Sequence, residues 1–339
     1  MRLIDCTYLN SPGGNKILEI LLDKIPSNEL KNFNFIIDFR ADITTLNKLK
    51  NTQYKLIKNS ELKRRAYYHS IKNKIEKCIC LANVPPPIKL KCDVIIYFHN
   101  DLLLKPKLSQ SFLKSISFFI KKTYIKMINS KKYKWAVQTN LMREKLSNEF
   151  LIKNEMINVL PIFRDFTEKK SLKKISNSFL YVCSSAPHKN LKRLINAFNL
   201  IQNIKDFNLS LHLTLDNKEY FHNGIFLKNI NPRLKIINHG MLSTRELESL
   251  YSESEFLIFP SLIESFGLPL IESVGFNCKV IAADLPYVDE VITPSIRFNP
   301  YSSKSIANAI DKAILSQNIP YSKLIIKNKI DKFINLINK

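Results

Sequence analysis

The feature that most constrains the fold of this chain is an alternation of short apolar runs with longer amphipathic stretches. Such alternation is typical of parallel β-sheets covered by helices. It stops in the polar, lysine-rich segment 164–178 and then starts again. The 339 residues suffice for two domains of ordinary size. We therefore predict an α/β fold of two doubly wound domains, which bind ligands at the carboxyl ends of their strands in a cleft between them.

The apolar runs and amphipathic stretches assign the individual elements. Strands of the first domain are expected at 2–9, 33–39, 54–57, 93–99, 135–139 and 156–161, and its helices near 15–25, 61–82, 109–129 and 141–149. In the second domain, strands are expected at 179–184, 209–215, 234–238, 256–259 and 279–282, and helices at 191–201, 243–252 and 269–275. We place the domains at 1–165 and 166–318, followed by a C-terminal helix within 319–339 that can pack back on the first domain.

Positive charge is concentrated in the first domain. The chain has 52 basic and 29 acidic residues, of which 30 and 14 lie in residues 1–165, and the stretch 102–143 contains no acidic residue. Two interpretations of 102–143 stay open: a solvated helix face over an ordinary core, or a surface attracted to anionic lipid headgroups. Nucleic-acid binding is not expected, because the aromatic residues follow helical spacing and form no stacking platform.

Several classes of protein are disfavoured by what the sequence lacks. It has no run of eighteen apolar residues for a transmembrane helix and no apolar segment of a secretory signal near its start. Its six cysteines do not follow the paired spacing of a zinc site. We expect a cytoplasmic protein, which would be peripheral at the inner face of the cytoplasmic membrane if 102–143 binds lipid.

Residues 260–272, which read Pro-Ser-Leu-Ile-Glu-Ser-Phe-Gly-Leu-Pro-Leu-Ile-Glu, carry the strongest chemical signal. They follow a predicted strand and open a predicted helix. Gly267, one of only six glycines, lets the backbone approach a ligand closely, and the amino end of a helix attracts anions. Glu264 in the loop and Glu272 one turn into the helix can accept hydrogen bonds from sugar hydroxyls. The alternative is that both carboxylates are solvated charges at an ordinary turn.

This segment resembles the Glu-x7-Glu element of retaining, GT-B fold glycosyltransferases of family 4, the glycosyl transferases group 1. The resemblance extends over 179–292 and includes Lys189-Asn190, the strand–glycine–helix segment around Gly240, and Asp284 with Glu290. In residues 1–165 it is looser and rests on Gly13-Gly14, His99 and Gln138-Thr139. It implies a GT-B fold, made of two Rossmann-like domains that face each other across a cleft.

The resemblance also implies roles for individual residues. The residues implied in catalysis are His99, Lys189 and Glu264. The residues implied in donor binding are Gly14, Gly240, Ser265, Phe266, Gly267, Leu268 and Glu272. Lys189 would neutralise the departing pyrophosphate, His99 would contact the transferred sugar, and Gly14 would let the first domain's loop close on the donor. The chain departs from the family at one place. The family commonly has an arginine about six residues before the lysine, and this chain has Cys183-Ser184-Ser185 there.

Each of these residues also has a structural explanation. His99 can be a histidine at the edge of a core, Lys189 one of many surface lysines, and Gly13-Gly14 an ordinary turn that lacks the third glycine of a dinucleotide site. The chain has no Asp-x-Asp, so we expect no metal and no other cofactor, with Lys189 and the helix end stabilising the leaving group. No nucleophilic carboxylate is evident in the first domain, so the resemblance implies front-face attack.

The predicted function is therefore transfer of a hexose, with retention and without a metal, from a nucleotide diphosphate sugar. The predicted acceptor is a surface polysaccharide or a lipid-linked oligosaccharide. The alternative is a non-catalytic, basic membrane- or nucleic-acid-binding protein that keeps the same scaffold.

Overall fold

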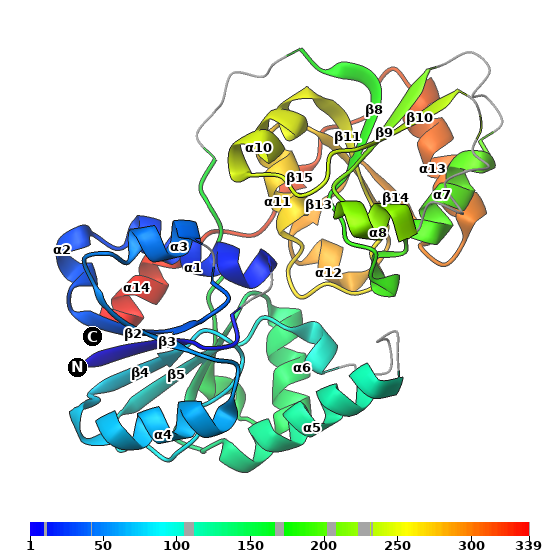
Figure 1. Cartoon of the computed structure of the whole chain (residues 1–339). Helices are drawn as coiled ribbons and strands as arrows, with labels where there is room; N and C mark the ends of the chain where they lie inside the picture. The colour runs from blue at the N-terminus through cyan, green and yellow to red at the C-terminus, as the bar shows by residue number, and fades with distance from the viewer. Residues whose placement is uncertain are drawn as a thin grey trace. The chain divides into compact units, whose positions relative to one another are not determined.

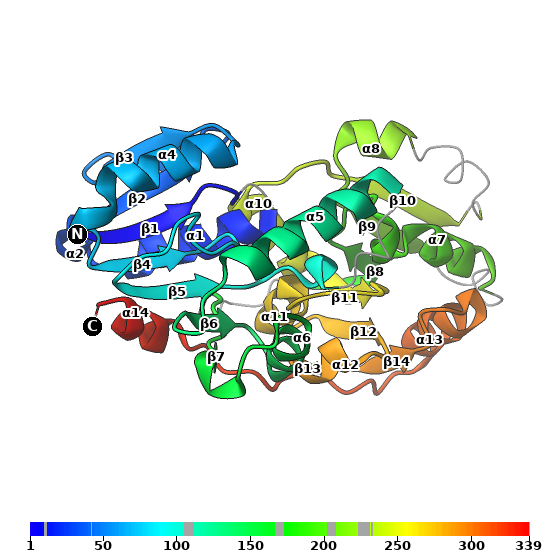
Figure 2. The same ribbon diagram turned by 90° about the horizontal axis from the view of Figure 1, so that it is seen from below.

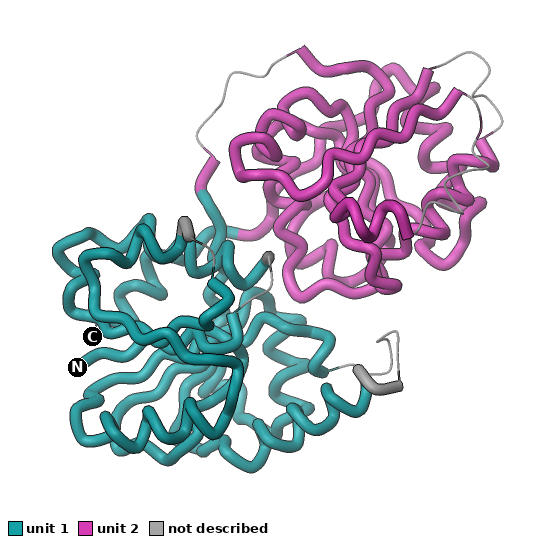
Figure 3. Tube along the Cα trace, viewed as in Figure 1, with its two compact units in different colours: residues 1–107, 111–164, 327–339 teal, residues 108–110, 165–326 magenta. Residues whose placement is uncertain are grey.

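The computed structural model describes residues 1–9, 12–41, 43–104, 112–166, 173–201, 208–222, 231 and 233–338. It divides into two compact units, coloured separately in Figure 3. The described residues of unit 1 lie within 1–104, 112–164 and 327–338, and those of unit 2 lie within 165–326.

Unit 1 is built on a seven-stranded parallel sheet with the order β3-β2-β1-β4-β5-β6-β7. Figure 2 shows β1, β4 and β5 side by side in this sheet. Its strands are β1 (Arg2–Cys6), β2 (Phe33–Asp38), β3 (Gln53–Ile57), β4 (Lys77–Cys80), β5 (Asp93–Tyr97), β6 (Lys134–Val137) and β7 (Ile157–Val159).

Helices cover both faces of this sheet, as Figure 1 shows. One face carries α1 (Pro12–Lys24), α2 (Ser27–Leu30), α3 (Ile43–Lys48) and α14 (Ile330–Asn338), whose apolar side chains share one core. The other face carries α4 (Glu61–Ile71), α5 (Phe112–Ile128) and α6 (Asn140–Phe150) over a second core. Short 3₁₀ turns occupy Lys72–Lys74, Asp101–Leu103 and Asn154–Met156.

Unit 2 is built on a six-stranded parallel sheet with the order β10-β9-β8-β11-β12-β14. Its strands are β8 (Ile175–Tyr181), β9 (Leu209–Leu213), β10 (Leu234–Asn238), β11 (Ser254–Phe259), β12 (Lys279–Ala283) and β14 (Ile296–Phe298). Its helices are α7 (Leu191–Asn199), α8 (Asn217–His222), α10 (Thr244–Glu253), α11 (Leu268–Gly275), α12 (Pro286–Asp289) and α13 (Ser303–Leu315), with a 3₁₀ turn at Pro187–Lys189. A small antiparallel pair joins β13 (Ile292–Thr293) to β15 (Lys323–Leu324).

The predicted fold class, two doubly wound α/β units, is confirmed, but the helix predicted over 61–82 is wrong at its end. The helix stops at Ile71, and Lys77–Cys80 form the central strand β4 between β1 and β5. All four residues of β4 are buried. A strand that is buried on both faces shows no alternation of polar and apolar residues, so periodicity cannot separate it from a preceding helix.

Three smaller differences concern boundaries. The segment 164–178, predicted as a linker, already contains the first residues of β8, which begins at Ile175. Arg297 and Phe298, which lie beyond the last strand expected in the second domain, belong to β14, which pairs with β12. Helix α1 begins at Pro12, so Gly13 and Gly14 lie in its first turn.

The end of the chain is shared between the two units. Residues 319–326 lie in unit 2, where β15 pairs with β13, and only α14 beyond them is helical. The buried side chains of α14 belong to the core of unit 1; they are Ile330, Phe333, Ile334 and Ile337. The ammonium of Lys77 donates to the carbonyl oxygen of Leu336 at 3.1 Å and secures the last turn of α14.

Candidate functional site

Two predicted residues of unit 2 are in direct contact at the carboxyl end of its sheet. Lys189 follows β8 and Glu264 follows the neighbouring strand β11, and Lys189 Nζ lies 2.6 Å from Glu264 Oε1. Both side chains are mostly covered, with exposed fractions of 18% and 14%. A pair that keeps some access to solvent can exchange its partner for a bound anion. The sequence predicted both residues but not that they form an ion pair.

Tyr181, at the end of β8, holds the two loops together. Its hydroxyl donates to the carbonyl oxygen of Lys189 and lies 3.4 Å from the hydroxyl oxygen of Ser261. The amide of Leu262 also donates to the carbonyl oxygen of His188 at 2.7 Å. These contacts fix the backbone on either side of the ion pair, so that only the side chains of the pair need to move.

Asn190 directly precedes α7 but does not cap it with its side chain. Its side chain makes no capping hydrogen bond, and its backbone lies in the left-handed region with φ of 60°. The amide nitrogen donates to the carbonyl oxygens of Pro260 at 3.1 Å and Pro300 at 2.7 Å. Asn190 therefore joins three loops, because asparagine tolerates positive φ and carries two amide donors.

Gly267 occupies the turn that opens α11. Its φ is 77°, and a Cβ atom placed on it would lie 3.0 Å from Leu270 Cδ1. Leu268 is the first helical residue and Pro269 the second, and the amide of Leu270 donates to the carbonyl oxygen of Gly267 at 2.9 Å. Glycine is thus required here by the turn, which starts α11 at Leu268, four residues after Glu264.

Glu272 lies one turn into α11, on the same segment. The hydroxyl of Tyr251, from α10, donates to Glu272 Oε2 at 2.9 Å. Tyr251 is buried, so it holds the carboxylate in one orientation. The other predicted residues of this loop are Ser265, half-buried, and Phe266, buried.

Gly240 lies beyond β10, at the far edge of the same sheet. Its φ is 70°, and a Cβ atom there would approach Asn217 Oδ1 to 3.3 Å. Next to it, His239 Nε2 and His212 Nδ1 are 2.8 Å apart, with stacked rings. Burial and the neighbouring ring lower the pKa of His212 to about 4.

The segment where the family has an arginine is neutral in this chain. Burial raises the pKa of the Cys183 thiol to about 12. The amide of Ser185 donates to Glu219 Oε2, from α8, at 2.9 Å. A carboxylate, and not a guanidinium, therefore contacts this loop, and Lys189 is the cation that the two loops bring to the site.

In unit 1, His99 lies just past β5 and is held in a fixed orientation. Its backbone amide donates to Asn83 Oδ1 at 2.6 Å, and its ring Nε2 lies 3.0 Å from the carbonyl oxygen of Leu81. The amide nitrogen of Asn83 lies 3.3 Å from the same ring nitrogen. The closer carbonyl can only accept, so we assign the proton to Nε2 and the acceptor role to Nδ1. Burial lowers the pKa of His99 to about 4, which keeps the ring neutral.

The resemblance implies that Gly14 lies in a loop of the first domain, but the structure has it in the first turn of α1. It is buried there, and neither Gly13 nor Gly14 has a positive φ. The residues before the helix, Asn10 and Ser11, lie outside the described part of the chain. The apolar side chains of α1 set where the helix begins, and a pair of glycines does not prevent it.

A buried ion pair in unit 1 was not predicted at all. Arg64 Nε donates to Asp5 Oδ2 at 2.8 Å, and both side chains are almost fully buried, with exposed fractions of 1% and 2%. Asp5 also accepts from Thr7 and Tyr68, and Arg64 donates to the carbonyl oxygens of Val84 and Pro85. The pair connects β1, α4 and the proline loop after β4.

Part of the basic stretch 102–143 forms helix α5, while residues 105–111 lie outside the described part. Four large apolar side chains on α5 are exposed: Ile116, Phe119, Ile120 and Met127. Lys122 and Lys126 pair with Glu149 of α6, and Lys121 is exposed. In the described parts of the chain, no helix combines the length and apolar character needed to cross a membrane.

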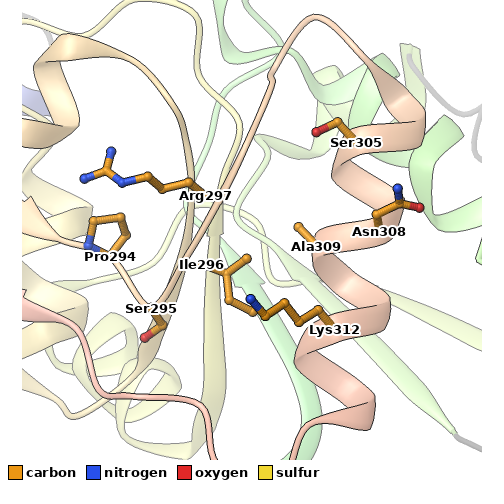
Figure 4. Close-up of a pocket in the computed structure, with 8 residues that line it drawn as sticks. All are labelled: Pro294, Ser295, Ile296, Arg297, Ser305, Asn308, Ala309 and Lys312. Carbon is orange, nitrogen blue, oxygen red and sulfur yellow. The ribbon is translucent and has the colours of Figure 1, made fainter.

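A cavity of about 470 Å³ lies elsewhere in unit 2, between β14 and α13 (Figure 4). Its walls include Arg297, Ser305 and Lys312. Arg297 is paired with Asp284 and Asp289, so its charge is already balanced. The described residues that line the cavity include none of the predicted site residues.

The chain is similar to known glycosyltransferases. Residues 163–331 match the family described as Glycosyl transferases group 1. The O-antigen chain mannosyltransferase RfbU of Salmonella typhimurium is 29% identical over 209 residues, which cover 57% of this chain and 55% of RfbU. The match to this curated relative therefore spans only about half of its length.

Two solved structures share the fold over most of the chain. WaaG, a glycosyltransferase involved in lipopolysaccharide biosynthesis, has a TM-score of 0.68 and 13% identity, covering 93% of this chain and 90% of WaaG. Anabaena HepE in complex with UDP and glucose has a TM-score of 0.67 and 13% identity, with the same coverage. At this identity the likeness is one of fold, and the fold is GT-B.

Proposed function

Residues 163–331 form a glycosyl transferases group 1 domain, and from this premise we propose that the chain transfers a hexose from a nucleotide diphosphate sugar to a glycan. The observation that carries the proposal is the Lys189–Glu264 pair beside the amino end of α11. The lysine and the amino end of the helix can bind phosphate, and the two carboxylates can accept hydrogen bonds from sugar hydroxyls. The solved structure of HepE holds UDP and glucose on the same fold, which supports a nucleotide sugar as donor.

In this mechanism the donor's phosphates lie at the amino end of α11, near Gly267 and Leu268. Lys189 leaves Glu264 and donates to the phosphate oxygens, which gain negative charge as the sugar–phosphate bond breaks. Glu264, released from the lysine, accepts from hydroxyls of the donor sugar. Glu272, oriented by Tyr251, accepts from the ribose hydroxyls. The pair thus keeps both groups ready in the absence of donor.

Retention would follow from attack on the same face that the phosphate leaves. The leaving phosphate then takes the proton of the acceptor hydroxyl, and no protein carboxylate becomes attached to the sugar. His99, neutral and with Nδ1 as acceptor, would receive a hydrogen bond from the transferred sugar. We propose no metal, because Lys189 and the helix end already supply positive charge at the leaving group.

The acceptor is a growing surface polysaccharide or a lipid-linked glycan. The names of the relatives support this class, since RfbU is an O-antigen chain mannosyltransferase and WaaG acts in lipopolysaccharide biosynthesis. A mannosyl donor is the first to test, although the identity to RfbU covers only part of each chain.

Helix α5 would bring the protein to such an acceptor at the cytoplasmic face of the membrane. Its exposed Phe119, Ile120 and Met127 lie among lysines on a helix with no acidic residue. Apolar side chains can enter the headgroup region, while each lysine near an anionic surface contributes about 1 kcal/mol. Sedimentation with phosphatidylglycerol vesicles tests this, and Phe119→Ser/Ile120→Ser should abolish it.

Donor hydrolysis tests the catalytic proposal directly. UDP-, GDP- and dTDP-sugars are assayed with the wild type, Lys189→Ala, Glu264→Ala and the control Lys192→Ala, an exposed lysine on α7. We expect wild-type and control activity with at least one donor, and loss in both site variants. Equal rates in all four proteins would refute the enzyme and favour the non-catalytic basic binding protein.

A further inference from the structure

The carboxyl edge of the unit 1 sheet holds an amide that no part of the described chain satisfies. Gln138 follows β6 and is only 4% exposed, yet its Oε1 atom is buried without a hydrogen-bond partner among the described residues. A buried amide oxygen without a partner costs about 1–3 kcal/mol. Such groups are few in folded proteins, and a ligand that completes them is one explanation.

Strand register places Gln138 beside His99. Tyr97 of β5 is paired with Ala136 of β6, and two residues further on His99 and Gln138 occupy matching positions. The amide of Phe98 donates to the carbonyl oxygen of Ala136 at 2.8 Å, so the ladder continues to this edge. Matching positions on adjacent strands carry side chains on the same face, about 5 Å apart.

The face is the one that carries helix α1. Tyr97 and Ala136, two residues earlier, belong to the core that includes α1, and alternation puts His99 and Gln138 on the same side. The ring of His99 is committed to β4 through Nε2 and Leu81, which leaves Nδ1 as the acceptor. Gln138 and His99 therefore offer two neighbouring polar groups that the described residues leave unused.

A second incompletely satisfied group lies on the same edge. Asp101, in the 3₁₀ turn after β5, is 3% exposed, and its Oδ2 accepts from Lys145 at 2.6 Å. Its other oxygen, Oδ1, is buried without a partner among the described residues. Other buried polar atoms without a partner among the described residues lie near β6, such as the hydroxyl of Tyr133 and Nε1 of Trp135. Gln138 and Asp101 differ from these two in lying at the carboxyl edge of the sheet.

We propose that Gln138 binds a hydroxyl of the transferred sugar next to His99 and so selects the donor sugar. The inference rests on the proposed function, because it needs a sugar donor. Both groups of the Gln138 amide are available: the oxygen accepts from a sugar hydroxyl, and the NH₂ donates to a neighbouring one. The ligand sets the orientation of the amide, since no hydrogen bond within the described chain does so.

The test replaces Gln138 with methionine, which has similar length and volume but no hydrogen-bonding amide. Tyr133→Phe is the matched control, since it also removes a buried, unpartnered oxygen from an end of β6. The hydrolysis rate is measured with the donor that the wild type prefers among UDP-, GDP- and dTDP-sugars, and with donors that lack one hydroxyl at a time. Thermal shifts with the matching nucleoside diphosphate measure whether unit 2 of each variant still binds the nucleotide.

We expect Gln138→Met to lose at least tenfold in kcat/KM and to keep the wild-type thermal shift with the nucleoside diphosphate. For the donor that lacks the contacted hydroxyl, wild type and variant should react at the same rate, which a merely structural role would not produce. Wild-type kcat/KM in Gln138→Met, with every donor, overturns the inference. Should the variant fail to fold, Gln138→Leu is used in its place and judged by the same donors.

The two proposals fail in different ways. If the wild type shows neither a thermal shift with any nucleoside diphosphate nor hydrolysis of any donor, the proposed function falls, and the role of Gln138 falls with it. If the wild type is active and Gln138→Met and Tyr133→Phe match it, only the role of Gln138 falls.

Discussion

Two covered ion pairs, Asp5–Arg64 in unit 1 and Lys189–Glu264 in unit 2, differ in how many other partners they have. In unit 1, Asp5 and Arg64 are almost fully buried and are held by further hydrogen bonds from side chains and carbonyl groups. In unit 2, Lys189 and Glu264 are more exposed, and the 2.6 Å contact joins their charged groups to each other.

Burial and partner number decide what each pair can do. Removing one member of a pair such as Asp5–Arg64 leaves a charge without water or a substitute, so the pair belongs to the folded structure. The Lys189–Glu264 pair can open at low cost, because solvent can replace either member and a phosphate can replace Glu264 as the partner of Lys189. An ion pair therefore stabilises the fold of unit 1, whereas an ion pair in unit 2 can exchange partners and bind a ligand.

The largest expected effect comes from breaking the buried pair. Arg64→Met should lower the free energy of unfolding by about 3–5 kcal/mol, because Asp5 stays buried without its cation. Urea unfolding of the two proteins measures the difference. Arg65→Met, which changes the exposed neighbour, is the control. A loss below about 1 kcal/mol in Arg64→Met would remove the distinction between the two pairs.

Breaking the pair in unit 2 should affect activity and leave stability nearly unchanged. Lys189→Ala should reduce kcat/KM about 10²–10³-fold, the usual effect of losing one group that stabilises developing negative charge. The free energy of unfolding should change by about 1 kcal/mol or less. Steady-state hydrolysis and urea unfolding are compared with those of Lys192→Ala. A large loss of stability would place this pair in the same class as Asp5–Arg64.

As the pH is lowered, His99 and His212 should reduce the stability of the fold before the buried Asp5–Arg64 pair is affected. Burial lowers the pKa of His99 and of His212 to about 4, while an unfolded histidine titrates near 6.5. Between these values the unfolded state binds more protons, so stability falls as the pH falls from about 6.5 to 4, by up to about 3 kcal/mol for each ring.

The contribution of Asp5 to stability is also lost as the pH falls, but in a lower pH range. Burial alone would raise its pKa, but Arg64, Thr7 and Tyr68 hold it below the ordinary value. Its contribution to stability is therefore complete above about pH 4 and is lost only at lower pH. Urea unfolding at pH 7, 6, 5 and 4 checks both statements, with His99→Gln expected to flatten the curve. A profile that is level from pH 7 to 4 would contradict the statement about the histidines.

The smallest effect is expected at Glu272. Tyr251→Phe removes the hydrogen bond that orients this carboxylate, which is worth about 1 kcal/mol. Binding of the preferred nucleoside diphosphate should weaken about fivefold, as calorimetry can measure. Tyr321→Phe, an exposed tyrosine of the same unit, should bind as the wild type does. Unchanged binding in Tyr251→Phe would show that Glu272 needs no orienting partner.

What could be predicted from the sequence is what is encoded locally. The segment around Gly267 and Pro269 specifies a strand, a turn with positive φ and a helix within a few residues. Lys189 and Glu264 could be assigned to one site because their segments resemble those of the family, and in the structure each follows a strand of the same parallel sheet. Both assignments depend on chain order and residue type, and neither depends on a long-range contact.

What could not be predicted depends on contacts between distant segments. The strand β4 is recognisable only by its neighbours β1 and β5, because its residues Lys77 to Cys80 are buried on both faces. Tyr181, Tyr251 and Arg64 look like ordinary residues of amphipathic elements until their partners are known. For Gln138 the informative property is a missing partner, which no sequence pattern records.

Helix α14 has a consequence for how the protein is made. The chain leaves unit 1 after residue 164, builds unit 2, and only then returns with Phe333 and Ile337 to the core of unit 1. At roughly 5–20 residues per second, the ribosome needs roughly 10–30 s to complete unit 2. During that time unit 1 has an open apolar face. The second unit can therefore fold first, and the first unit is finished last.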